Sequence, residues 1–145
     1  MGLRVALVTP FAWSQPHEVN EHVDGVAGAL RALGHEVTVL APSNNAADLR
    51  AGRKALGAGG TASPARAGAA WPAGGVVALG PALPVSRRSS LGVPVGMRAG
   101  LLLALSLGRF DVVHGVEPGL PSLSYVALRD ADALCVATFL SADRL

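Results

Sequence analysis

The amino-acid sequence predicts an α/β fold with a doubly wound, mostly parallel sheet, and three observations predict it. Short runs rich in Val and Leu, each of strand length, recur along the chain. Helical patterns lie between them, which is the order expected of parallel strands joined by crossover helices. The length of 145 residues suits a single domain, and half of the residues are hydrophobic, which is enough for a core.

The first half of the chain reads as one strand–helix–strand unit. Residues 3–9 (LRVALVT) form a continuous apolar run, typical of a strand buried on both faces. Residues 18–33 carry apolar side chains at helical spacing, and Gly34 just beyond them is a typical helix stop. A second strand is expected at residues 36–40 (EVTVL).

The second half repeats the pattern after a segment rich in Ala and Gly. Residues 43–75 are predicted to be mostly a flexible loop, with one helical candidate at 46–56. Cys135 falls inside the last apolar run and is therefore expected to be a small buried side chain. The remaining elements are expected as strands at 76–79, 111–114 and 134–138 and as helices at 93–107 and 120–129.

Composition narrows the class of protein. Lys and Arg total 12 against 10 Asp and Glu, and only 4% of residues are aromatic, so nothing favours nucleic-acid binding. A single cysteine excludes an internal disulfide and a thiolate zinc site, and we expect a reducing cytoplasmic location. The most apolar run, residues 99–107, is about half of the roughly 20 residues that span a bilayer. Its leucines at 101–107 fit a buried crossover helix better than a membrane contact.

Several common motifs are missing. No glycine lies between Thr9 and Asp24, so the glycine-rich turn of a dinucleotide site is not present after the first strand. Lys54 lacks the flanking glycines of a phosphate-binding loop, and no G-x-S-x-G nucleophile motif occurs. His17 and His22 are five residues apart, whereas the helical zinc motif places its histidines four apart, so no metal site is expected.

The segments at the predicted strand ends resemble a known family. These segments are VALVTPFAW, LRALGHEVTVLAP, DVVHGVEPGLPSLSYVAL and VATF. Together they resemble the N-terminal, Rossmann-like domain of GT-B fold retaining glycosyltransferases of family 4, most closely the phosphatidylinositol mannosyltransferase branch. The resemblance covers nearly the whole chain. It implies a cleft at the carboxyl ends of the strands, with a nucleotide sugar, GDP- or UDP-linked, as donor substrate and no other cofactor.

The resemblance and the strand ends together indicate the candidate site. His114 and Glu117 are expected at the end of the fourth strand; a buried histidine and a helix-capping carboxylate are the alternative roles. Arg87 and Arg88 suit an anionic headgroup, or are solvated loop residues. The full set of candidate residues for the acceptor and donor cleft is Pro10, Phe11, Trp13, His17, Glu18, His22, Arg87, Arg88, His114, Glu117, Ser122 and Thr138.

Two departures from the family pattern affect this site. The family usually has a Gly-Gly pair in the first loop, where this chain reads Pro16-His17-Glu18. The family also has a histidine beside the transferred sugar in a T-F-H motif, where this chain has Leu140. Leucine neither donates a hydrogen bond nor titrates, so no catalytic residue is assigned.

The sequence therefore predicts the acceptor-side domain of a retaining glycosyltransferase, inactive alone and incomplete at its C-terminus. Its acceptor would be a lipid headgroup or small molecule, its sugar mannose in the closest branch, and its partner the C-terminal donor-binding domain or a separate chain carrying it. Peripheral contact with the inner face of the membrane is implied by the same branch. The alternative is a non-catalytic Rossmann-like remnant acting as a binding or regulatory module. A flavodoxin-like or response-regulator-like domain is disfavoured, because no phosphate-binding Ser/Thr loop or acidic cluster follows the first strand.

Overall fold

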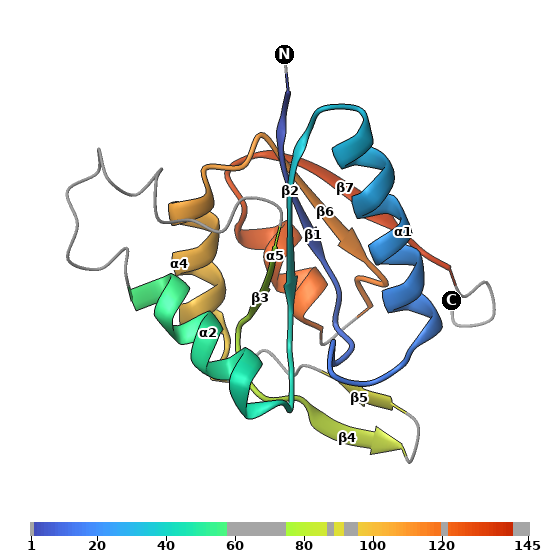
Figure 1. Ribbon diagram of the computed structural model, residues 1–145, viewed down its shortest axis with the longest axis vertical. Helices are drawn as coiled ribbons and strands as arrows, with labels where there is room; N and C mark the ends of the chain where they lie inside the picture. Colours follow the sequence, from blue (N-terminus) through green and yellow to red (C-terminus); the bar gives the residue numbers. More distant parts are fainter. Residues whose placement is uncertain (1, 58–74, 87–88, 92–95, 120–121, 141–145) are drawn as a thin grey trace.

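The computed structural model describes residues 2–57, 75–86, 89–91, 96–119 and 122–140. Strands and helices alternate along most of this part of the chain (Figure 1). In order, the elements are β1 (Arg4–Val8), α1 (Glu18–Ala32), β2 (Glu36–Ala41), α2 (Ala46–Gly57), β3 (Val76–Ala78), β4 (Leu83–Ser86), β5 (Ser89–Leu91), α4 (Arg98–Gly108), β6 (Val112–Val116), α5 (Leu123–Asp130) and β7 (Leu134–Thr138).

The main sheet has the strand order β3-β2-β1-β6-β7, and every neighbouring pair in it is parallel. From β1 the chain moves outward to β2 and β3, then returns past β1 to β6 and β7. This reversal makes the sheet doubly wound, and the predicted fold class is confirmed. The strand order reverses between β1 and β6, and open α/β sheets bind their ligands at the carboxyl ends of such strands.

Helices cover both faces of the sheet. Helix α1 lies on one face, while α2, α4 and α5 lie on the other (Figure 1). Each face has its own apolar core, and β1 contributes to both, with Leu7 on the α1 side and Ala6 on the opposite side. Because alternate residues of a strand point to opposite faces, a strand buried on both sides must be apolar throughout, as the LRVALVT run predicted.

The structure corrects several predicted boundaries. Helix α4 begins at Arg98 rather than at 93, and α5 begins at Leu123 rather than at 120, where Ser122 provides the cap. Helix α2 over 46–57 confirms the helical candidate at 46–56 within the segment predicted to be mostly loop, and residues 58–74 lie outside the described part. The antiparallel β4–β5 hairpin was not predicted, because its short strands have little apolar patterning.

Strand β7 is the edge of the sheet, and its exposure contradicts the prediction for Cys135. Cys135 is exposed, and so are Leu134 at 67% and Val136 at 39%. The apolar sequence of β7 suggested a buried strand. Among the described elements, however, β7 packs mainly against β6 and α5. One long side of the strand and much of both faces therefore remain open to solvent.

Helix α4 contains the apolar run that sequence reading placed in a buried crossover. Leu101 and Ala104 are fully buried against the sheet, while Leu103 is 39% exposed. The helix is thus half-buried rather than free on the surface. Of the helices that the structure describes, none combines the length and the apolar character needed to cross a membrane.

Candidate functional site

The candidate site lies where β1, β6 and β7 end and α1 begins. The loop between β1 and α1 brings Phe11 and Trp13 to this edge, and His22 follows on α1. His114 comes from β6, Glu117 follows β6, and Thr138 ends β7. Segments far apart in the sequence therefore meet at the switch point of the sheet, which is the arrangement the strand-end motifs predicted.

The β1–α1 loop is held by its own side chains. His17 is the N-cap of α1, and its Nδ1 accepts a hydrogen bond from the Val19 backbone N–H at 3.1 Å. The same imidazole stacks on the Phe11 ring, with 3.8 Å between centroids and 14° between planes. At the position where the sequence resemblance implies glycine, His17 caps a helix and stacks on Phe11.

Loss of this cap has a predictable cost. We expect His17→Ala to lower the free energy of unfolding by about 0.5–2 kcal/mol, since one helix N–H loses its acceptor. His17→Asp removes the ring stack equally but restores an oxygen acceptor at the N-cap. Urea unfolding of both variants measures the difference. Equal losses in the two variants would contradict a capping role.

His114 and Thr138 join the two strands on the α1 side of the sheet. His114 Nε2 lies 2.7 Å from Thr138 Oγ1, within hydrogen-bonding distance. His114 is the third of five residues in β6, so the prediction that it ends this strand is wrong by two residues. Burial lowers the pKa of His114, and repulsion by the charged form of His22 on α1 lowers it further. The structure therefore favours a neutral His114 imidazole.

This shift makes stability depend on pH. The unfolded chain takes up a proton at His114 before the folded chain does, so the stability from neutral His114 is complete above about pH 6.5 and falls as the pH drops below it. We expect His22→Asn to raise the pKa of folded His114 and to reduce that fall. Titration of the His114 ring by NMR checks the direction, and an unchanged or lower pKa would contradict it.

Glu117 fastens the end of β7 to the end of β6. Its backbone N–H donates to the Thr138 carbonyl at 2.8 Å, and its carboxylate accepts a hydrogen bond from the Leu140 backbone N–H. Its φ of 49° lies in the left-handed region, which is uncommon for a non-glycine residue. Ser122, rather than Glu117, accepts the Tyr125 N–H at the start of α5. Leu140 is thus held beside the candidate site.

Other predicted residues have structural roles or lie elsewhere. The Ser122 hydroxyl caps α5 by accepting from the Tyr125 N–H at 3.1 Å, and it is buried. Pro10 is buried as well, whereas Glu18 and His22 are exposed on α1. Arg87 and Arg88 lie outside the described residues. Sequence analysis did not single out Asn20 and Thr9, which are buried polar residues. Their polar side chains were the only feature of the sequence that could have indicated a role at the site.

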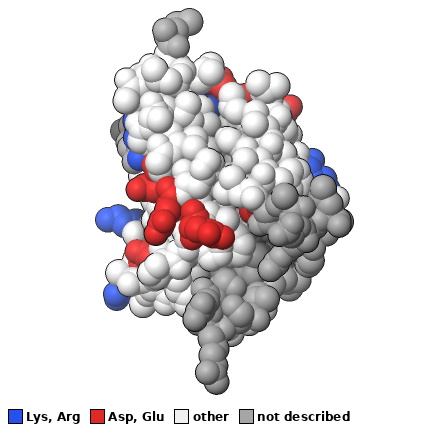
Figure 2. Space-filling view, turned by 90° about the vertical axis from the view of Figure 1, so that its right-hand side faces the viewer, with Lys and Arg blue, Asp and Glu red and all other residues white. Residues whose placement is uncertain are grey.

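An open hollow of about 430 Å³ borders the loop and α1. Trp13 and Pro16 provide its apolar wall, and Glu21 and Asp24 its acidic side. The view onto the α1 side shows Asp and Glu side chains gathered on that face (Figure 2). An aromatic ring beside carboxylates suits a ligand with both an apolar face and hydroxyl donors, and the negative charge disfavours a phosphate.

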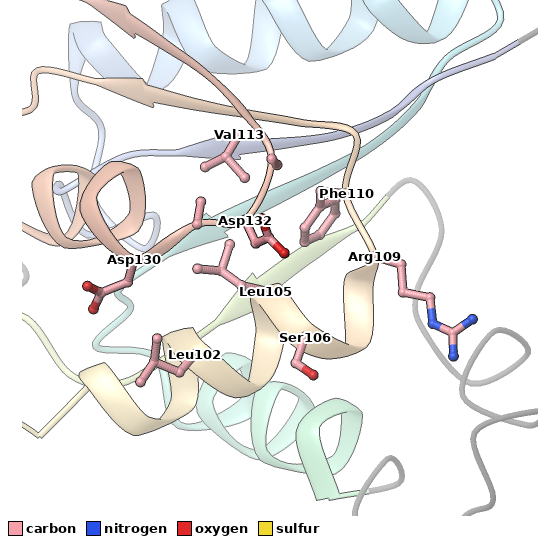
Figure 3. Close-up of a pocket in the computed structure, with 10 residues that line it drawn as sticks. Leu102, Leu105, Ser106, Arg109, Phe110, Val113, Asp130 and Asp132 are labelled. Atoms are coloured by element: carbon pink, nitrogen blue, oxygen red, sulfur yellow. The ribbon is translucent and has the colours of Figure 1, made fainter.

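A second, more enclosed hollow of about 360 Å³ lies near the amino ends of β6 and β7 (Figure 3). Leu105 from α4, with Phe110 and Val113, lines it, and the Arg109 side chain points away from the other labelled side chains. At its border the hydrogen bond from Arg129 lowers the pKa of Asp130 to about 2. This hollow lies at the opposite edge of the sheet from the switch point, so we do not assign it to the candidate site.

In the part of the chain that the structure describes, no group of three or more His, Cys, Asp or Glu side chains is placed to hold a metal ion.

Comparison with known proteins identifies the family. Residues 19–143 match the profile of Glycosyltransferase Family 4, which covers most of the chain and every element from α1 to β7. The chain belongs to glycosyltransferase family 4. The predicted family resemblance is confirmed.

Similar proteins from actinobacteria narrow the branch of this family 4 member. The phosphatidyl-myo-inositol mannosyltransferase of Propionibacterium freudenreichii is 33% identical over 140 residues, and that of Mycolicibacterium smegmatis is 34% identical over 137 residues. The enzyme of the same name from Mycobacterium leprae is 32% identical over 140 residues. Each match covers 94% of this chain but only 30–32% of the relative, so the chain spans about a third of their length.

Proposed function

We propose that this chain is the acceptor-side part of a retaining glycosyltransferase. It would hold a lipid headgroup or similar polyol while a sugar, mannose as in the names of its relatives, arrives from a nucleotide sugar. The observation that carries the proposal is the open hollow beside Trp13, between the β1–α1 loop and the first turns of α1. It is bordered by carboxylates that can accept hydrogen bonds from hydroxyl groups.

The charge of this hollow supports an acceptor rather than a donor role. Glu18 and Glu21 occupy the first turn of α1, and the His17 ring already occupies one of the N–H groups there. A helix N-terminus binds phosphate when its N–H groups are free, and adjacent carboxylates oppose that binding. The donor diphosphate would therefore be bound chiefly by the part of the relatives that this chain does not span.

The partner in this proposal is a donor-binding domain. The chain would form a cleft with it, and closure of the cleft would bring the sugar to the acceptor. We also place the assembled protein at the inner face of the membrane, because phosphatidyl-myo-inositol in the relatives' names is a membrane lipid. Arg98, at the start of α4, is paired with Asp130 at 3.1 Å and is not assigned to this contact.

Ligand binding by the chain itself tests the proposal. We would titrate isotope-labelled protein with myo-inositol and, separately, with GDP-mannose, and follow the amide resonances by NMR. The proposal predicts saturable shifts with myo-inositol at residues 11–24 and 114–117, and no saturable shifts with GDP-mannose at the same concentration. Saturable shifts with GDP-mannose in those segments, or none with myo-inositol, would contradict it.

The alternative is a non-catalytic remnant that keeps the fold and binds without transferring sugar. His17 and Glu18 in place of glycines, and Leu140 in place of histidine, favour it. It differs from the first proposal in one respect: a remnant supplied with a donor-binding domain would still transfer no sugar.

A further inference from the structure

Asn20 is a buried polar residue near the start of α1 that no motif explains. It is 7% exposed, and its side-chain amide is fully used. Nδ2 donates to the carbonyls of Phe11 at 3.3 Å and Ala12 at 3.1 Å, while Oδ1 accepts from the Thr9 hydroxyl at 2.6 Å. One side chain of α1 thus forms hydrogen bonds with three residues of the segment that precedes the helix: Thr9, Phe11 and Ala12.

The partner of Asn20 extends this network into the loop. Thr9 is fully buried, and its hydroxyl makes two hydrogen bonds. It donates to Asn20 Oδ1 and accepts from the Phe11 backbone N–H at 3.3 Å. Beyond the reach of Asn20, the Trp13 backbone N–H donates to the Pro42 carbonyl at 2.8 Å, which ties the loop to the end of β2. The loop is therefore held at Phe11, Ala12 and Trp13, although it contains no glycine.

We propose that Asn20 is the positioning residue of the candidate site. Its amide donors hold residues 11 and 12 in the single conformation in which Phe11 stacks on His17 and Trp13 lines the open hollow. The acceptor-side wall therefore exists before any ligand binds, and binding costs little ordering of the loop. This inference rests on the proposed function only in calling the hollow an acceptor site.

Hydrogen exchange of the free chain tests the role of Asn20 without any substrate. Asn20→Asp keeps the shape and the Thr9 contact but removes both donors to the loop carbonyls. We expect exchange of the backbone amides of residues 11–15 to rise at least about tenfold, since two ordinary hydrogen bonds are lost. In a Trp71→Phe background, where Trp13 is the remaining tryptophan, its emission should also shift and become more accessible to acrylamide.

The chain offers a matched control. Asn45 caps α2, with Oδ1 accepting from Ala47 N at 2.9 Å and Asp48 N at 3.2 Å. Asn45→Ala should speed exchange at residues 46–49 and leave exchange at residues 11–15 and the Trp13 emission unchanged. If Asn20→Asp does not fold, Thr9→Val removes the acceptor for the Phe11 N–H at nearly constant volume and should raise exchange at residue 11.

A folded Asn20→Asp protein whose loop amides exchange within twofold of the original rate would overturn the proposal, and so would a folded Thr9→Val protein with unchanged exchange at residue 11. So would an equal rise in exchange at residues 11–15 in Asn45→Ala, because that would indicate general loosening. Neither outcome depends on sugar transfer. Failure of Asn20 as a positioning residue is thus distinguishable from failure of the proposed function.

Discussion

Replacing Leu140 with histidine should raise sugar transfer by a factor on the order of 10² once the chain is joined to the donor-binding part of one of its relatives. The family resemblance puts a histidine at this position beside the transferred sugar, whereas a leucine side chain neither titrates nor donates a hydrogen bond. The Leu140 backbone N–H donates to the Glu117 carboxylate. This bond holds the backbone of residue 140 in place, so a histidine side chain introduced there would have a defined position at the site. Steady-state transfer from GDP-mannose to phosphatidylinositol vesicles measures the gain.

Phe139 supplies the control for this prediction. It is adjacent to Leu140 and 60% exposed, so Phe139→His adds the same imidazole one residue away. That variant should leave transfer at the level of the unmodified joined protein. Equal rates for Leu140→His and the unmodified protein would show that the leucine is not what limits the reaction.

The second large effect is on stability. Replacing Leu7 with alanine should lower the free energy of unfolding by about 2–5 kcal/mol. Leu7 is fully buried in the central strand β1, and it belongs to the core beneath α1. The truncation leaves a cavity in the layer that positions the start of α1 and its loop. Chemical denaturation monitored by circular dichroism gives the value.

Leu33 is the matched control for Leu7. It is 74% exposed just beyond the end of α1, so Leu33→Ala removes the same atoms without opening a cavity. We expect a change within about 0.5 kcal/mol. Losses of similar size at both positions would contradict the assignment of Leu7 to the core.

The sequence was sufficient for the fold where local patterns and burial agree. The apolar run of β1 and the amphipathic α1 with its glycine stop led directly to a parallel strand–helix–strand unit. Cys135 shows where sequence-based prediction of burial fails. An apolar strand has the same sequence pattern at the centre of a sheet and at its edge, because the neighbouring elements determine its exposure. The β4–β5 hairpin was missed because its short strands carry little apolar periodicity.

For the candidate site, sequence placed the strand-end residues in the right region but not their contacts. The meeting of His114 with Thr138 depends on the register of β6 against β7, which no local pattern specifies. Ser122 resembled a site residue because helix caps and binding residues share the same polar types. Asn20 was overlooked because its amide binds carbonyls 8 and 9 residues away in sequence, and only the folded loop brings them together.

Sugar transfer by the joined protein tests the central claim most directly. Labelled mannose would be followed from GDP-mannose to phosphatidylinositol vesicles, with the 145-residue chain alone measured in parallel. An acceptor-side domain predicts transfer by the joined protein and none by the chain alone. A joined protein that is folded and binds both substrates, yet transfers no sugar even with Leu140→His, would contradict the account and favour the non-catalytic remnant.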